Sequence, residues 1–207
     1  MMLAVLLLAC RVDPGLPDYP EIATYQGGSQ AGYEGFQPWE GQARLSFGIF
    51  YEGGATETVA IDGVSNHYYI YSLTYSQGPD ADRIEGSASD RITVGSQGWW
   101  GGGVHWDSEQ DLSSWSTLHL GLRATDSTFQ DLTVGMTGGE EEVRVRVGDY
   151  GFIADGTWQE VNLPLSALAE AGADLTRVTI PLQMIAEGAV ADSELLVDDV
   201  YLAVEEE

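Results

Sequence analysis

The chain has 207 residues, 43% of them hydrophobic and 10% aromatic, which is enough for one sizeable core. Its 33 acidic and eight basic residues give a formal net charge of -25, and such a charge repels phosphate backbones and anionic lipid surfaces. Every basic residue is an arginine. We therefore expect a soluble, acidic domain with no nucleic-acid partner and no lysine-dependent chemistry.

The first ten residues, MMLAVLLLAC, form an apolar run that ends at Cys10. The run is too short to span a bilayer and is typical of the hydrophobic region of an export signal. Residues 7–10 resemble a bacterial lipobox, which implies that Cys10 is lipidated and that the membrane is reached only through this anchor. The resemblance predicts an exported protein at the bacterial outer membrane or cell surface. The alternative is a chance apolar N-terminus, since no Lys or Arg precedes Cys10.

Residues 11–42 contain four prolines and scattered glycines without apolar periodicity. This composition is typical of a flexible tether. The single cysteine excludes an internal disulfide. We expect a signal segment over 1–10, a tether over 11–42 and one folded domain over 43–207.

From about residue 43 the pattern changes to apolar residues at every second position, which is typical of half-buried strands. The predicted strands cover 45–51, 69–75, 118–124, 132–136, 143–147 and 178–184. Turn clusters separate them at 52–54, 76–80, 137–140 and 155–156, and residues 164–172 are the one expected helical turn. This spacing predicts an all-β fold, an antiparallel two-sheet sandwich of the jelly-roll type.

Several phrases occur in a familiar order: GWWGGG (98–103), DLSSWSTLHLGLRA (111–124), GTWQEVNLPLSAL (156–168), DLTRVTIPLQM (174–184) and SELLVDDVYLAV (193–204). In this order they resemble the galactose-binding-like β-sandwich family of carbohydrate-binding modules, over roughly 45–204. The resemblance implies binding of a polysaccharide or cell-wall glycan, often with a structural calcium ion.

Residues 95–107, GSQGWWGGGVHWD, set three tryptophans and a histidine among five glycines. Glycine permits close approach of a ligand, and an indole offers a flat apolar face suited to a sugar ring. We interpret Trp99, Trp100, Trp106 and His105 as ligand contacts. The alternative is that the indoles fill the core, although adjacent residues of a strand point in opposite directions.

Polar residues alternate with leucine or valine at His119, Arg123, Arg144 and Arg146. If their strands are neighbours in one sheet, the four side chains form a cationic stripe that donates hydrogen bonds to sugar hydroxyls or acidic sugars. The alternative is that the arginines pair with some of the many carboxylates.

Calcium is the metal that the resemblance implies, with Glu52 and Asp198 at the positions of the family's ligands. Carboxylate oxygens are the donors that hard cations prefer. The three histidines lack the sequence spacing of a zinc site, so a transition metal is not expected.

Catalytic motifs are weak: no GxSxG elbow is present, and neither Glu109 with Asp111 nor His105 with Asp107 stands out as an acid–base pair. We therefore predict a non-catalytic, polysaccharide-binding lipoprotein of the cell envelope. Two alternatives stay open: a surface module that binds or assembles with another protein, and a glycan-active hydrolase or lyase.

Overall fold

A computed structural model describes residues 44–47, 57–59, 66–84 and 88–203. The expected signal segment with Cys10, the tether over 11–42 and the expected calcium ligand Glu52 lie outside these residues. The domain boundaries therefore stay predictions. None of the helices in the described part is long and apolar enough to cross a membrane.

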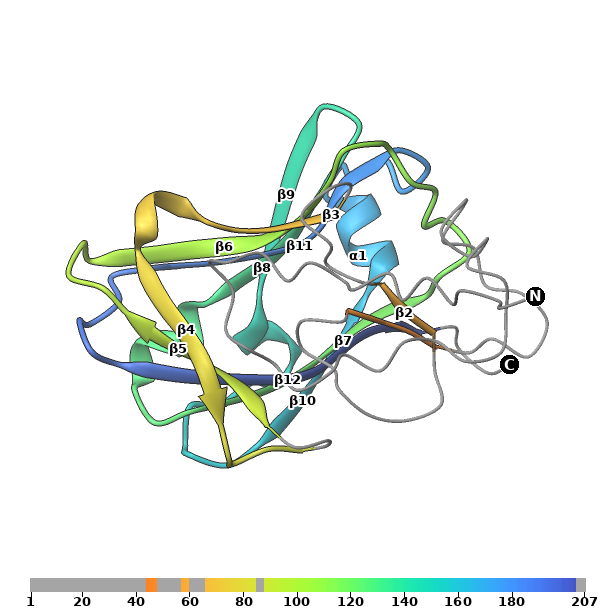
Figure 1. The fold of residues 1–207 in the computed structure, drawn as a ribbon. Coiled ribbons are helices and arrows are strands. Elements are labelled where there is room, and N and C mark those ends of the chain that lie inside the picture. Colours follow the sequence, from red (N-terminus) through yellow and green to blue (C-terminus); the bar gives the residue numbers. More distant parts are fainter. Residues whose placement is uncertain (1–43, 48–56, 60–65, 85–87, 204–207) are drawn as a thin grey trace, which may run out of the picture.

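The described strands form two sheets packed face to face (Figure 1). One sheet contains β1 (Arg44–Phe47), β2 (Glu57–Val59), β4 (Tyr75–Asp80), β5 (Ser89–Val94), β7 (Thr117–Ala124), β10 (Gln159–Pro164) and β12 (Glu194–Ala203). The other has the order β3-β6-β11-β8-β9, with bounds β3 (Asn66–Ile70), β6 (Trp99–Trp106), β11 (Val178–Glu187), β8 (Thr133–Gly138) and β9 (Glu141–Arg146). We call them the seven-stranded and the five-stranded sheet.

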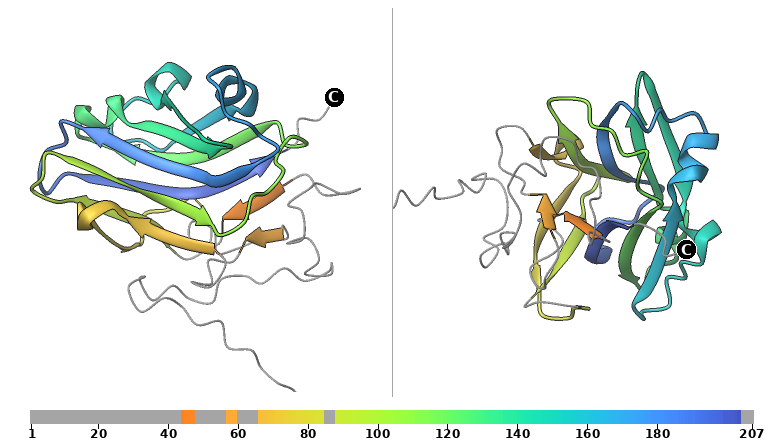
Figure 2. Two further views of the ribbon diagram at one scale, coloured as in Figure 1. Left: turned by 90° about the horizontal axis from the view of Figure 1, so that it is seen from above. Right: turned by 90° about the vertical axis from the view of Figure 1, so that its right-hand side faces the viewer.

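Every strand pair described is antiparallel except β1 with β2. The core lies between the sheets and is filled by alternate residues of each strand, as Leu118, Leu120 and Leu122 of β7 show, each fully buried. The predicted antiparallel β-sandwich is confirmed. Figure 2, in its left view, looks onto the five-stranded sheet from outside.

The helices are short. The helical turn expected over 164–172 is α1 (Leu165–Glu170), which buries Leu165 and Leu168. Three 3-10 turns complete the described elements: η2 (Tyr71–Leu73), η3 (Ser127–Asp131) and η4 (Val147–Tyr150).

Residues 76–80, expected to be a turn, belong to β4. Within the described part β4 pairs only with β5, where Pro79 lies opposite Asp90. A proline is tolerated on an edge strand because its missing N–H leaves no ladder bond unmade there. The Gly78-Pro79 pair therefore indicates an edge strand instead of a turn.

The strand expected over 69–75 is interrupted. After β3 the chain turns sharply at Ser72 and Leu73, whose φ angles are 49° and 54°, and the Thr74 N–H donates to the Tyr71 carbonyl. This corner carries the chain from the five-stranded to the seven-stranded sheet. Tyr75 consequently points into the core, whereas Tyr69 and Tyr71 stay half-buried on the outer side.

Candidate functional site

The glycine- and tryptophan-rich stretch forms strand β6 in the middle of the five-stranded sheet, between β3 and β11. Trp100 is 0% exposed and Trp106 1% exposed. Trp100 packs edge-on against Phe129 at a ring-centroid distance of 6.2 Å, and Trp106 stacks on Phe47 at 6.5 Å. Their expected role as ligand contacts is therefore wrong, because the strand's alternation directs both indoles into the core. Trp99 points the other way and is half-buried.

The glycines of β6 make room for neighbouring chains. A Cβ on Gly102 would lie 2.3 Å from the Tyr75 hydroxyl oxygen, and one on Gly103 would lie 2.1 Å from the Leu182 carbonyl oxygen. On the outer side, a Cβ on Gly101 would lie 3.1 Å from Cδ2 of Tyr71. Glycine is thus required here for packing between strands, and the ring of Tyr71 covers the strand where a side chain would otherwise stand.

Three half-buried aromatic side chains lie in a row on this outer side. The ring centroids of Tyr69 and Tyr71 are 5.0 Å apart, and those of Tyr71 and Trp99 are 6.3 Å apart. Beneath them Gln183 of β11 donates from Nε2 to the Tyr71 hydroxyl at 2.9 Å and to the Tyr69 hydroxyl at 3.4 Å. We call Tyr69, Tyr71, Trp99 and Gln183 the aromatic face.

The register of the strands extends this face across the sheet. Tyr69 lies opposite Gly103, which lies opposite Gln183, and Gln183 in turn lies opposite Gly135 of β8. Gly135 is paired with Arg144, whose Cγ would be 2.5 Å from a Cβ at that glycine. The aliphatic stem of Arg144 therefore crosses β8 toward Gln183.

Some polar groups in and beside the aromatic face already have partners within the protein. Gln183 is fully buried, and its Oε1 has no hydrogen-bond partner among the residues that the structure describes. Burial is the main cause that raises the pKa of the Tyr69 hydroxyl above its ordinary value. The guanidinium of Arg144 lies 3.3 Å from Glu142, and that of Arg146 lies 2.5 Å from Asp131.

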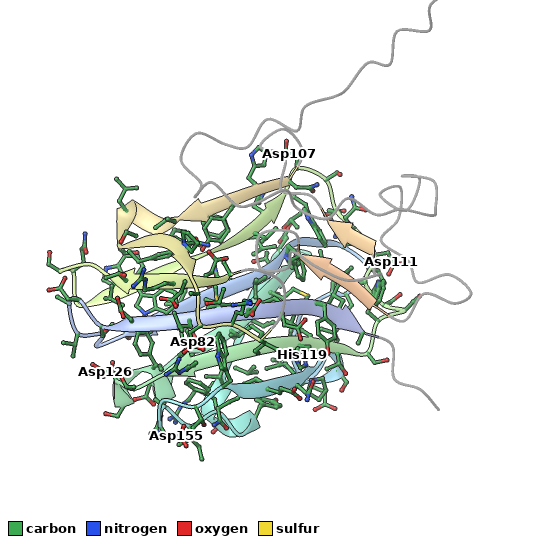
Figure 3. All side chains as sticks on the ribbon, turned by 60° about the horizontal axis from the view of Figure 1, so that its bottom comes forward. Asp82, Asp107, Asp111, His119, Asp126 and Asp155 are labelled. Carbon is green, nitrogen blue, oxygen red and sulfur yellow. The ribbon has the colours of Figure 1, made fainter. Side chains whose placement is uncertain are left out.

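The predicted cationic stripe is wrong, because β7 and β9 lie in different sheets. His119 is 4% exposed on the seven-stranded sheet and stacks on Tyr201 with ring centroids 4.3 Å apart. Arg123 forms an ion pair with Asp82 and donates to the Gly156 carbonyl. Neither side chain can therefore join Arg144 and Arg146 at one ligand. Figure 3 shows Asp82 and His119 well away from Asp107, the residue that follows β6 of the five-stranded sheet.

His105 lies at the far end of the outer side of β6. It is paired in register with His67 of β3, and Asp107 lies beside both. The side chains of the two histidines are 43% and 36% exposed. The structure thus places His105 on the same side of the sheet as Trp99.

Asp198, the second expected calcium ligand, is 1% exposed on β12. Its carboxylate accepts the N–H groups of Ile84 and Asp199, at 2.7 and 2.8 Å. A second buried carboxylate, Asp90, has no hydrogen-bond partner for either oxygen within the described residues. Burial, and then the charge of Asp198, raises the pKa of Asp90.

A full metal-binding group is not seen: no cluster of three or more His, Cys, Asp or Glu side chains in the described ranges could hold an ion. The two buried acids nevertheless have the donor chemistry of a hard-cation site, and sequence reasoning missed Asp90 because its burial depends on strand pairing.

The carboxylates considered for catalysis have structural partners. Glu109 accepts two hydrogen bonds from Arg177, at 2.6 and 3.0 Å. Asp111 caps the following turn by accepting the Ser113 N–H at 2.9 Å. Each of these two carboxylates is therefore held by a structural partner within the described part of the chain.

Comparison with known proteins relates most of the chain to one family. The model of carbohydrate binding domain 30 matches residues 47–203. A solved family 30 carbohydrate-binding module superposes with a TM-score of 0.53 and 19% sequence identity, covering 63% of this chain and 75% of its own.

A second structure, the family 30 module of a cellulosomal cellulase of Clostridium thermocellum, has a TM-score of 0.50 and 19% identity over 68% of this chain and 87% of its own. No curated protein matches the chain. At such identities the structures show a shared fold.

Proposed function

The chain belongs to the family of carbohydrate binding domain 30, and from this premise we propose that it binds a polysaccharide, without catalysis, on the outer side of its five-stranded sheet. One observation carries the location: the aromatic face places three ring systems in a row beside polar groups that hold them. Family membership supports a polysaccharide as the ligand, and the row of aromatic rings supports the outer side of the five-stranded sheet as the binding surface.

The chemistry of the face suits a sugar chain. Aromatic rings pack against the apolar C–H faces of sugars, while the tyrosine hydroxyls and the indole N–H at their polar edges can exchange hydrogen bonds with sugar hydroxyls. The buried amide of Gln183 holds the tyrosine hydroxyls in place. A row of rings offers contact to successive sugar units. Because the net charge is -25 and Arg144 and Arg146 are paired with acids, we propose a neutral rather than an acidic polysaccharide.

The experiment is a binding assay of the purified chain against a panel of cellulose, mixed-linkage glucan, xylan and pectin. Trp99→Ala is expected to weaken binding of the recognised polysaccharide at least tenfold, since a tryptophan that dominates a binding surface contributes roughly 2 kcal/mol or more. Trp158→Ala is the matched control: Trp158 is also half-buried but lies with Asp82 beside the other sheet.

Binding that survives Trp99→Ala but is lost in Trp158→Ala would move the site to the seven-stranded sheet. Absence of binding to every polysaccharide, with the parent chain folded, would contradict the proposed function. In that case the aromatic face would be tested as a surface for a protein partner.

Calcium is proposed as a structural ion near the start of β5, where Asp90 and Asp198 would hold it by carboxylate oxygens. The support is the buried carboxylate of Asp90, which has no hydrogen-bond partner within the described residues and lies near the carboxylate of Asp198. A buried carboxylate without a partner is costly, and a divalent cation offsets that cost. A bound ion would stabilise the junction of β5 with β12.

We predict that a chelator lowers the melting temperature by several degrees. A ligand at about 100 times its Kd stabilises by about 2.7 kcal/mol, and about 1 kcal/mol shifts the melting temperature of a chain this long by about 2–4 °C. Asp90→Asn should abolish the response to calcium. A melting temperature that ignores both chelator and added calcium would refute the ion.

We further propose that Cys10 carries a lipid that anchors the module at the cell surface, on the basis of the lipobox-like residues 7–10. Replacing the cysteine, Cys10→Ser, should move the protein from the membrane to the soluble fraction. A variant that continues to sediment with membranes would count against the anchor.

A further inference from the structure

We propose a second binding site, for a transition-metal ion such as Zn²⁺ or Cu²⁺, formed by the imidazoles of His67 and His105. The two residues lie directly opposite each other on β3 and β6, thirty-eight positions apart in sequence by the difference of their numbers. The two histidines are too far apart in sequence to suggest a metal site, and the pairing of β3 with β6 brings them together.

The two rings lie side by side, and each places one nitrogen near the same carboxylate oxygen. Their centroids are 6.1 Å apart with an interplanar angle of 39°. Nε2 of His67 lies 3.1 Å from Oδ1 of Asp107, and Nδ1 of His105 lies 3.8 Å from the same oxygen. Two imidazole nitrogens therefore approach a common position, and both side chains are accessible from solvent.

This arrangement suits a borderline metal ion better than a hard one. Imidazole nitrogen binds zinc at about 2.0–2.1 Å and also suits copper and nickel. Residues directly opposed in an antiparallel pair have Cβ atoms about 4.5–5.5 Å apart, so small side-chain rotations let both nitrogens reach one ion.

The site has two protein ligands, with water in the remaining positions. This agrees with the absence of any three-residue metal group among the described residues. Because Oδ1 of Asp107 lies against the same nitrogens that would bind the ion, this carboxylate moves aside when the ion binds, and its negative charge beside the site favours a cation. The chain's strongly negative charge raises the local concentration of cations.

Such an ion would tie β3 to β6. Within the described part β3 pairs only with β6, and two residues beyond His67 it carries Tyr69 of the aromatic face. The ion would therefore stabilise an edge strand beside the proposed glycan site. The metal site itself does not depend on the glycan proposal.

The test is calorimetric titration of the full chain with Zn²⁺. The chain carries Cys10→Ser to remove its one thiol, and excess Ca²⁺ occupies the carboxylates. We expect one equivalent to bind, and His67→Gln or His105→Gln to weaken binding at least tenfold. Glu187→Gln, an exposed acid on the same sheet, is the matched control and should bind as the parent does.

Electron paramagnetic resonance of the Cu²⁺ form supplies a second readout, with nitrogen coupling from two imidazoles expected. Three results would overturn the site: no stoichiometric binding, unchanged affinity in both histidine variants, or coupling from a single imidazole. Each of these measurements is independent of whether any polysaccharide binds.

Discussion

At the scale of single residues, the glycines of β6 decide where the aromatic rings go. Alternation along the stretch predicts that Trp99 and Trp100 point in opposite directions, and they do. Sequence alone does not say which of the two faces the core. It also does not reveal that Gly101 is covered by Tyr71, because that ring comes from a residue thirty positions earlier by number.

The sequence analysis predicts Trp99 of the aromatic face as a ligand contact, but it missed the other three members, Tyr69, Tyr71 and Gln183. The sequence predicts one strand over 69–75 with Tyr69 and Tyr75 on the same face, but the corner at Ser72 and Leu73 separates them. Gln183 carried no sequence signal, since one polar residue among apolar ones on a strand is common. Its importance follows from register alone, which sets it beneath both tyrosines.

A glycine prediction follows at this scale. Gly103→Ala should lower the free energy of unfolding by about 1–3 kcal/mol, because its new methyl group would meet the backbone of β11. Gly78→Ala is the control, since a Cβ there has nothing within 4 Å. Chemical denaturation measures both variants, and an equal effect of the two would show that close strand packing is not the reason for glycine at 103.

At the scale of elements, strand content was predictable where leucine and valine alternate with polar residues. The stretches 118–124 and 178–184 fall within β7 and β11, and the stretch 132–136 overlaps β8 from its first residue, Thr133. β4 and β6 were obscured by glycine and proline, which are typical of turns but are tolerated at an edge or required for close packing.

Assignment of strands to sheets could not be predicted from periodicity. Both β7 and β9 alternate in the same way, yet one pairs with β12 and the other with β8. The prediction of a cationic stripe was wrong for this reason, since strand pairing is decided by contacts between distant parts of the chain. Arg144 kept the outward orientation that alternation indicated, but its neighbours are β8 and β11 instead of β7.

At the scale of the whole molecule, the charge of -25 sets the conditions for stability. Like charges spread over a compact surface repel one another and disfavour the folded state. Salt shortens the screening length from about 10 Å at 0.1 M to about 3 Å at 1 M. The folded chain should therefore gain more from added salt than a neutral domain does.

We predict that the melting temperature rises between 0.05 M and 1 M NaCl by several degrees. Scanning calorimetry at fixed calcium concentration measures it, and sucrose at equal osmolality controls for general exclusion of the solute. A melting temperature that falls or stays constant with salt would show that self-repulsion is too small to matter.

The central claim is that a polysaccharide contacts the outer side of the five-stranded sheet. Its most direct test is nuclear magnetic resonance of the ¹⁵N-labelled chain, following the indole N–H signals while the recognised polysaccharide is added. The signal of Trp99 is predicted to shift, while those of the buried Trp100 and of Trp158 beside the other sheet stay in place. A shift of Trp158 with an unchanged Trp99 would contradict the account.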